Sequence, residues 1–170
     1  TKELEAMQTE VSARKRLRES VISHEGIRDK TYLDTKGIPT IGVGFNLQRA
    51  DAKALIESVG ADYNKILNAT QTLSRKQIET LLQHDLDYFI KKAPQVVSSC
   101  PTLPEDVRLI IIEMLFQLGE SRFSKFQKFI DALKERDWNK AADEMLDSKW
   151  AREDSPNRAK ELATRMRAVK

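Results

Sequence analysis

One short segment breaks the helical pattern of this 170-residue chain, and it constrains the fold more than any other feature. Between residues 30 and 45 the sequence runs Thr-Tyr-Leu, then Asp-Thr-Lys-Gly, then Ile-Pro-Thr-Ile-Gly-Val-Gly-Phe. Two β-type runs around a turn predict a β-hairpin whose strands flank residues 34–37. Because a hairpin is only marginally stable alone in water, it must pack against helices. The chain is therefore expected to be α+β and mainly α.

The other segments space their apolar residues as amphipathic helices do. Helices are predicted at residues 1–24, 51–59, 63–67, 74–93, 102–118, 123–133, 138–146 and 155–169. Gly26 is expected to end the first helix, and Ser74 with Gln77 matches a capping box. Residues 107–118 are apolar on nearly every face, so their helix should be the centre of the larger core.

Composition excludes several classes of protein. The net charge of +3 is too small to indicate a nucleic-acid partner, and no nucleic-acid recognition motif is present. Five basic residues against one acidic residue in 158–170 suit an anionic cell wall equally well. A single cysteine and two histidines leave little for a metal site, so no metal or cofactor is expected. Neither a membrane-spanning run nor a secretory signal is present in these residues.

Reactive side chains concentrate around the predicted hairpin, where Glu25, Asp34 and Thr40 lie close together in sequence. Glu25 falls at the predicted end of a helix, and Asp34 follows nine positions later at the turn. Two carboxyl groups with contrasting environments at a cleft are what the cleavage of a glycosidic bond requires. On composition and spacing alone, a surface glutamate and a turn aspartate remain the simpler explanation.

Five motifs, taken in order, resemble the T4-type phage lysozymes. They are His-Glu-Gly at 24–26, Asp-Thr-Lys-Gly at 34–37, Thr-Ile-Gly-Val-Gly at 40–44, Phe-Gln-Leu-Gly-Glu at 116–120 and Ser-Pro-Asn-Arg-Ala-Lys at 155–160. The resemblance covers about residues 15–168. Each motif alone would be uninformative, but five in register are highly specific.

The resemblance implies a lysozyme-like fold for a single domain over 1–170. A hairpin-containing lobe would span about residues 15–73. A long helix over about 74–93 would join it to an all-helical lobe over about 94–170, with the active-site cleft between the lobes. Residues 1–14 would be an N-terminal helical extension that is separable from catalysis.

The implied activity is that of an N-acetylmuramidase, which hydrolyses the β-1,4 bond between N-acetylmuramic acid and N-acetylglucosamine in peptidoglycan. Glu25 would be the general acid that protonates the leaving oxygen. Asp34 would assist the attacking water or stabilise the oxocarbenium-like transition state, and Thr40 would help to hold that water. The family inverts at the anomeric carbon, as separated carboxyl groups with room for a water molecule allow.

Four further positions match or replace residues that line the family's cleft: Asn46, Phe116, Gln117 and Arg158. Arg158 matches an arginine that lies near the acid. Plain core packing explains Phe116 equally well, whereas the amide of Gln117 suits a hydrogen bond to an N-acetyl group or a sugar hydroxyl.

The chain departs from the family pattern after Gly44, where the usual His-Leu is Phe45-Asn46. The missing histidine commonly pairs with the aspartate that Asp85 matches, so that ion pair cannot form. Asn46 replaces an apolar cleft residue by an amide, which alters sugar contacts without touching the Glu–Asp–Thr set.

The alternative function is a non-catalytic lysozyme-like module that binds the cell wall, which replacement of Glu25 or Asp34 would indicate. Neither residue is replaced. The expected partner is the peptidoglycan glycan strand, and the chain is expected to be a monomer or a domain of a larger protein. An endolysin would act from the host bacterial cytoplasm on the periplasmic wall during host cell lysis, whereas a virion-associated lysozyme would belong to a particle.

Overall fold

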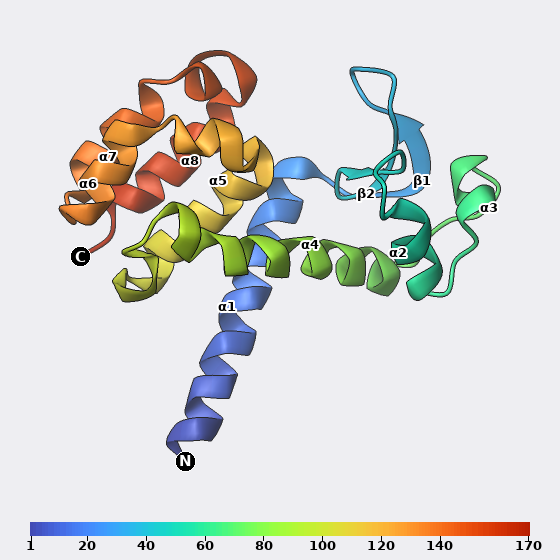
Figure 1. Cartoon of the computed structure of the whole chain (residues 1–170), viewed down its shortest axis with the longest axis horizontal. Coiled ribbons are helices and arrows are strands. Elements are labelled where there is room, and N and C mark those ends of the chain that lie inside the picture. Colours follow the sequence, from blue (N-terminus) through green and yellow to red (C-terminus); the bar gives the residue numbers. More distant parts are fainter. The chain divides into compact units, whose positions relative to one another are not determined.

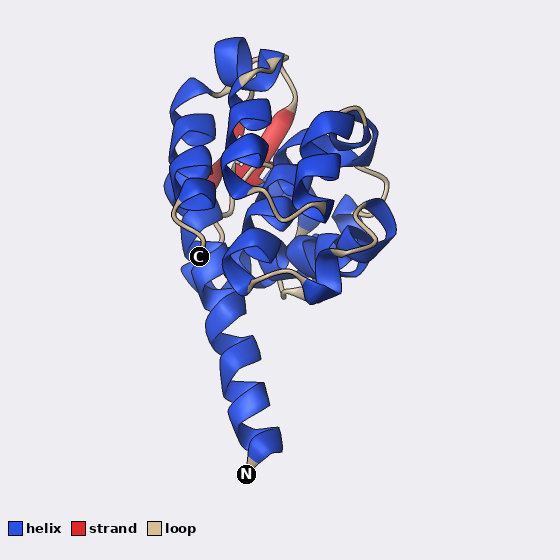
Figure 2. Ribbon diagram, turned by 90° about the vertical axis from the view of Figure 1, so that its left-hand side faces the viewer, coloured by secondary structure: helices blue, strands red, loops and turns tan.

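The computed structural model describes all residues, 1–170, and they form two compact units (Figure 1). The first unit is Thr1–Asp87 and the second is Tyr88–Lys170, so the division falls inside helix α4 (Arg75–Val96). Helices predominate in both units, and the strands belong to the first (Figure 2). The expectation of a mainly helical α+β chain is confirmed. None of the helices combines the length and the apolar character needed to span a membrane.

The first unit contains a small antiparallel sheet and four helical segments. In chain order they are α1 (Lys2–Glu25), β1 (Arg28–Leu33), β2 (Pro39–Gly42), β3 (Phe45–Asn46), α2 (Ala52–Ser58), α3 (Tyr63–Leu67) and the first part of α4. Two hydrogen bonds tie the sheet to the segment around α3. The Thr31 hydroxyl donates to the carbonyl of Ile66 (2.6 Å), and the Leu73 N–H donates to the carbonyl of Asp29 (2.9 Å).

Helix α1 includes the predicted N-terminal extension without interruption. Residues 1–12 are all exposed, and Figure 1 shows these turns extending beyond the other elements of their own unit. Leu17 and Val21, further along the helix, are buried. The helix ends at Gly26 as predicted: its φ is 78°, and its N–H donates to the carbonyl of Ile22 (2.8 Å).

The sheet has the strand order β1-β2-β3, with both pairs antiparallel. The predicted turn at 34–37 joins β1 to β2, and the Asp34 N–H donates to the carbonyl of Ile38 (3.0 Å). The predicted hairpin is present as β1 and β2, but the β-type run 38–45 also contains the start of a third strand, which the sequence does not predict. Gly42 and Gly44 adopt φ values of 68° and 66°, so the chain reverses there and forms β3.

Gly42 also lies against helix α4, which makes it the glycine least able to accept a side chain. A Cβ at Gly42 would lie 3.2 Å from Cγ2 of Ile78, whereas a Cβ at Gly60 (φ 85°) would meet nothing within 4 Å. Gly60→Ala should therefore cost about 1–2 kcal/mol from its positive φ alone, and Gly42→Ala about 1–3 kcal/mol more from overpacking. Urea unfolding of both variants measures the difference, and equal stabilities would contradict the close contact.

Helix α4 begins with the predicted capping box. The Gln77 N–H donates to Oγ of Ser74 (3.1 Å), and the Ser74 N–H donates to Oε1 of Gln77 (2.8 Å). The prediction that this helix stops before Pro94 is wrong, because it continues to Val96. Pro94 has no N–H to donate and its ring crowds the carbonyl four residues earlier, but it lies in the last turn, which the Val97 N–H still closes on the carbonyl of Ala93 (2.8 Å).

The second unit is all-helical. After the end of α4 it contains a 3₁₀ turn at Cys100–Thr102, α5 (Glu105–Ser124), α6 (Gln127–Lys134), α7 (Trp138–Leu146), a π-helical turn at Trp150–Asp154 and α8 (Pro156–Arg167). Most residues of α5 before Gly119 are buried, which confirms that this helix is a core element. Gly119 (φ 79°, ψ 164°) interrupts α5 where the sequence predicts its end. The π-helical turn is absent from the predicted pattern.

Candidate active site

The first unit places Glu25 at the last position of α1, next to the turn between β2 and β3. The side chain of Glu25 is exposed. A Cβ built on Gly44 would lie 3.9 Å from its Oε2, so the Glu25 carboxyl group faces the bare backbone of that turn.

Asp34 occupies the turn between β1 and β2 and uses one carboxylate oxygen to build it. Its Oδ1 accepts hydrogen bonds from the N–H groups of Lys36 (2.8 Å) and Ile38 (2.9 Å). Such an Asx turn fixes the orientation of the carboxylate. Its Oδ2 makes no hydrogen bond within the protein, so a structural role for one oxygen is compatible with a catalytic role for the other.

Thr40 lies in the middle strand, directly between two partner residues of the ladder. Its side chain is 4% exposed, and its hydroxyl donates to the carbonyl of Ile38 (2.8 Å). The hydroxyl oxygen keeps lone pairs with which it can accept a hydrogen bond from water. Asn46 stands opposite Thr40 in β3, and its Oδ1 accepts from the Gln48 N–H (2.7 Å). The sheet thus brings two of the sequence-predicted site residues side by side.

Arg49 pairs with Asp85, the aspartate for which the resemblance implies a histidine partner at the position that Phe45 occupies. The two guanidinium nitrogens Nη1 and Nη2 donate to the two carboxylate oxygens of Asp85, each at 2.8 Å. The guanidinium carbon lies 4.7 Å from the ring centroid of Phe45, the residue that replaces the histidine. These hydrogen bonds raise the pKa of Arg49 further above its ordinary value. Nδ1 of the neighbouring His84 also lies 3.4 Å from Oδ1 of Asp85, so Asp85 contacts both Arg49 and His84, whereas position 45 supplies a phenylalanine.

Arg49 also holds Asp51, and this contact gives the stability of the protein a defined pH dependence. Arg49 donates to Oδ1 (2.6 Å) and Oδ2 (3.0 Å) of Asp51, and this hydrogen bonding lowers the pKa of Asp51 below its usual range. The pKa in the folded protein lies below that in the unfolded chain, about 3.9. The stabilisation is therefore complete above the unfolded pKa and is lost as the pH falls through the folded pKa.

Acid titration of the unfolding free energy should reveal this dependence. Between pH 6 and pH 3 the unchanged protein should lose more stability than Asp51→Asn, because the amide has no charge to lose. The half-exposed position of Asp51 keeps the difference small. Identical slopes for the two proteins would contradict the coupling.

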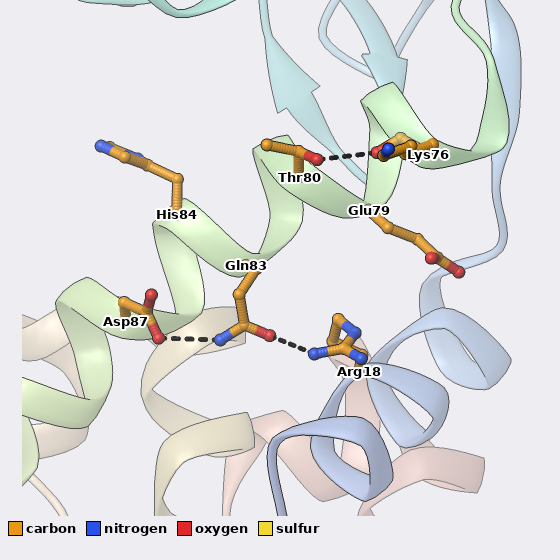
Figure 3. A pocket seen from close by; sticks show the side chains of 7 residues that line it. All are labelled: Arg18, Lys76, Glu79, Thr80, Gln83, His84 and Asp87. Carbon is orange, nitrogen blue, oxygen red and sulfur yellow. Dashed lines mark hydrogen bonds between the residues drawn. The ribbon is translucent and has the colours of Figure 1, made fainter. Parts of the chain in front are cut away.

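A polar groove of about 490 Å³ lies elsewhere in this unit, between α1 and α4 (Figure 3). Its lining residues are Arg18, Lys76, Glu79, Thr80, Gln83, His84 and Asp87. Arg18 donates to Oε1 of Gln83 (2.6 Å), and Nε2 of Gln83 donates to Oδ1 of Asp87 (2.8 Å). The sequence predicts none of these residues for the site, and their hydrogen bonds fasten α1 to α4.

In the second unit, both the oxygen and the nitrogen of the Gln117 side-chain amide make hydrogen bonds. Its Oε1 accepts from the indole N–H of the buried Trp150 (2.8 Å), and its Nε2 donates to Oγ of Ser155. Ser155 precedes α8 and makes no side-chain cap bond of its own. Sequence reasoning misses this network. One N–H of the amide remains for the predicted sugar contact.

Arg158, at the start of α8, is 6% exposed and faces a buried glutamate on α5. Its Nε lies 3.5 Å from Oε2 of Glu113, which is 1% exposed. Sequence reasoning also misses Glu113, although a single charged residue among 109–119 signals a buried partner. Phe116, half-buried on α5, packs edge-to-face on Phe89 with ring centroids 6.1 Å apart.

Comparison with known proteins identifies the family of the chain. The family model described as Phage lysozyme matches residues 22–168. Probable T4-type lysozyme 1 of Dictyostelium discoideum is 29% identical, over 79% of this chain and 84% of that protein. The Pre-baseplate central spike protein Gp5 of Enterobacteria phage T4 is also 29% identical, over 74% of this chain but only 23% of its own length. The match over most of the chain, together with its lysozyme-like α+β fold, shows that it belongs to the T4-type phage lysozyme family.

Proposed function

We propose that the chain is an N-acetylmuramidase that hydrolyses the β-1,4 bond between N-acetylmuramic acid and N-acetylglucosamine in peptidoglycan. One observation carries the proposal. A member of the phage lysozyme family keeps Glu25, Asp34 and Thr40 in the family's order, within a single unit and around one small sheet. A module that only binds the wall has no need to retain all three.

In the proposed reaction, the carboxyl group of Glu25 donates its proton to the glycosidic oxygen as the bond from that oxygen to C1 of the muramic acid breaks. A water molecule adds to C1 on the opposite face and gives up one proton, to the Asp34 carboxylate or to solvent, so the product is inverted. Asp34 assists that water or stabilises the positive charge that develops on the sugar. The oxygen Oδ2 of Asp34, which makes no hydrogen bond within the protein, supports either role. Thr40 helps to hold the water.

Asp34→Asn tests this role without removing the turn, because the amide oxygen can still accept the bonds from Lys36 and Ile38. The variant should stay folded and lose about 10²-fold or more in turnover, since it lacks the negative charge. Turnover on purified peptidoglycan and the circular dichroism spectrum measure the two effects. A folded variant with normal turnover would remove Asp34 from the mechanism.

We further propose that Asn46, Phe116, Gln117 and Arg158 contribute to substrate binding. Asn46 keeps its amide NH₂ group as a donor, and Gln117 keeps one N–H. Phe116 offers a half-exposed ring edge, and Arg158 a fixed cation. The cell-wall glycan supplies the acceptors and apolar ring faces that these groups suit.

Analysis of the reducing ends of a digest tests the proposed activity. Purified peptidoglycan is incubated with the protein in EDTA, reduced with borohydride and analysed by mass spectrometry. The proposal predicts soluble disaccharide-peptides that end in reduced muramic acid. Ends in reduced glucosamine, ends in 1,6-anhydromuramic acid, or a bound but intact glycan would each contradict it, and the last would support the binding-module alternative.

The biological setting follows from the kinds of relative. The chain spans most of a protein named a T4-type lysozyme and about a quarter of a phage spike protein. We propose the same wall hydrolysis in either setting, as an endolysin that acts from the host cytoplasm or as the lysozyme portion of a virion component.

A further inference from the structure

The register of the sheet places a third polar side chain in line with Thr40 and Asn46. Tyr32 pairs with Thr40 in the β1–β2 ladder, and Thr40 pairs with Asn46 in the β2–β3 ladder. Side chains directly opposite each other on antiparallel strands lie on the same face, with Cβ atoms about 4.5–5.5 Å apart. The neighbouring pair Ile41 and Phe45 is buried on the other face. Tyr32, Thr40 and Asn46 therefore form one row on one face of the sheet, called the polar row below.

The ring of Tyr32 is held from one side by an arginine of the same strand. The guanidinium carbon of Arg28 lies 4.6 Å from the ring centroid. The register of β1 shifts between these two residues, and such a bulge bends a strand and re-aims its side chains. Arg28 itself is exposed and pairs with no carboxylate. A cation over the face of a ring is attracted to it, and this attraction biases the ring toward one orientation.

The chemistry of the polar row suits a neutral polyhydroxylated ligand. A threonine hydroxyl, an asparagine amide and a tyrosine hydroxyl supply donors and acceptors without a charge. The Tyr32 hydroxyl makes no hydrogen bond within the protein, and the residue is half-buried. Its ring adds an apolar surface on which the C–H groups of a sugar can rest.

We infer that Tyr32 contacts the glycan beside Thr40, and that Arg28 acts as its positioning residue by holding the ring. The inference rests on the proposed function, because it assigns a sugar to the same face of the sheet. Sequence reasoning places Tyr32 in a strand and in the stretch before Asp34 that carries the family resemblance, but assigns it no role. The cross-strand register is what reveals its place in the polar row.

Kinetics with soluble peptidoglycan fragments separate a binding role from a structural one. Tyr32→Ala should raise KM about tenfold and leave kcat within about twofold, the effect of losing one aromatic contact of roughly 1.4 kcal/mol. Tyr32→Phe keeps the ring and should raise KM less than threefold. Arg28→Met should fall between the two, because the ring stays but is no longer held. Tyr32→Leu keeps apolar bulk without a ring, and it replaces Tyr32→Ala in the KM measurement if the alanine variant is unstable.

Tyr88→Ala is the control, because Tyr88, like Tyr32, has a cation over its ring, here Lys92 at 5.8 Å. It should leave KM unchanged. Melting temperatures near that of the unchanged protein must accompany the kinetic effects. Fragment binding by equilibrium dialysis, with Glu25→Gln as the background, provides a readout that does not need turnover.

The outcomes distinguish this inference from the proposed function. Suppose that the protein without substitutions hydrolyses the fragments. If folded Tyr32→Ala or Tyr32→Leu then shows normal KM and normal fragment binding, the role of Tyr32 is overturned and the proposed function stands. A lower kcat at constant KM would likewise contradict a binding role. If the protein without substitutions neither binds nor hydrolyses the fragments, both the proposed function and this inference are overturned.

Discussion

Glu25→Gln should abolish wall hydrolysis while the protein stays folded and still binds wall fragments. Glutamine keeps the shape and the hydrogen-bonding ability of the side chain but has no proton to give to the leaving oxygen. General acid catalysis contributes about 10²–10⁴-fold, so turnover should fall by at least that factor. Because Glu25 ends α1, where the helix carries partial negative charge, its neutral replacement should melt at the same temperature or slightly higher.

Glu19→Gln is the control for this variant, since Glu19 is also an exposed glutamate of α1. It should leave turnover unchanged. Turnover on purified peptidoglycan, fragment binding and melting temperature are measured for both. Folded Glu25→Gln with near-native turnover would remove Glu25 from the chemistry, whatever family the chain belongs to.

The second large effect is expected on stability, at the buried pair of Glu113 and Arg158. Removing one partner of a buried ion pair costs about 3–5 kcal/mol, and the separation of 3.5 Å between Nε and Oε2 favours the lower end. Glu113→Leu should therefore unfold about 3 kcal/mol more easily. For a protein of this size, the melting temperature should fall by roughly 6–12 °C.

Two further variants show whether the charge pair is the cause. Glu113→Gln keeps a hydrogen-bond acceptor beside Arg158 and should lose less stability than Glu113→Leu. Combining Glu113→Leu with Arg158→Met removes both charges, and the double variant should regain part of the loss. Additive losses in thermal and urea unfolding would show that the two side chains are not coupled.

The positions of most elements follow from local sequence. The capping box at Ser74 and Gln77, the glycine end at Gly26 and the proline start of α8 each act within a few residues, so pattern reasoning finds them. The extra strand β3 is missed because Gly42 and Gly44 read as strand residues in a β-rich run. Their positive φ values become visible only in three dimensions.

The parts of the site that depend on distant partners are predicted least well. The sequence shows that position 45 holds phenylalanine where the family resemblance implies a histidine partner for Asp85, but not that Arg49 binds Asp85 through two hydrogen bonds. It assigns the amide of Gln117 to substrate without the hydrogen bond from Trp150, 33 positions away. Which distant residues become partners depends on how the elements pack, and a single sequence does not show that packing.

Digestion of peptidoglycan in H₂¹⁸O tests the central proposal, hydrolysis with Glu25 as the acid, most directly. Mass spectrometry of the released fragments reports where solvent oxygen enters the product. The account predicts one ¹⁸O at C1 of each new muramic acid end with the unchanged chain, and no such ends with Glu25→Gln. Unlabelled 1,6-anhydro ends, or equal labelled release from Glu25→Gln, would contradict it.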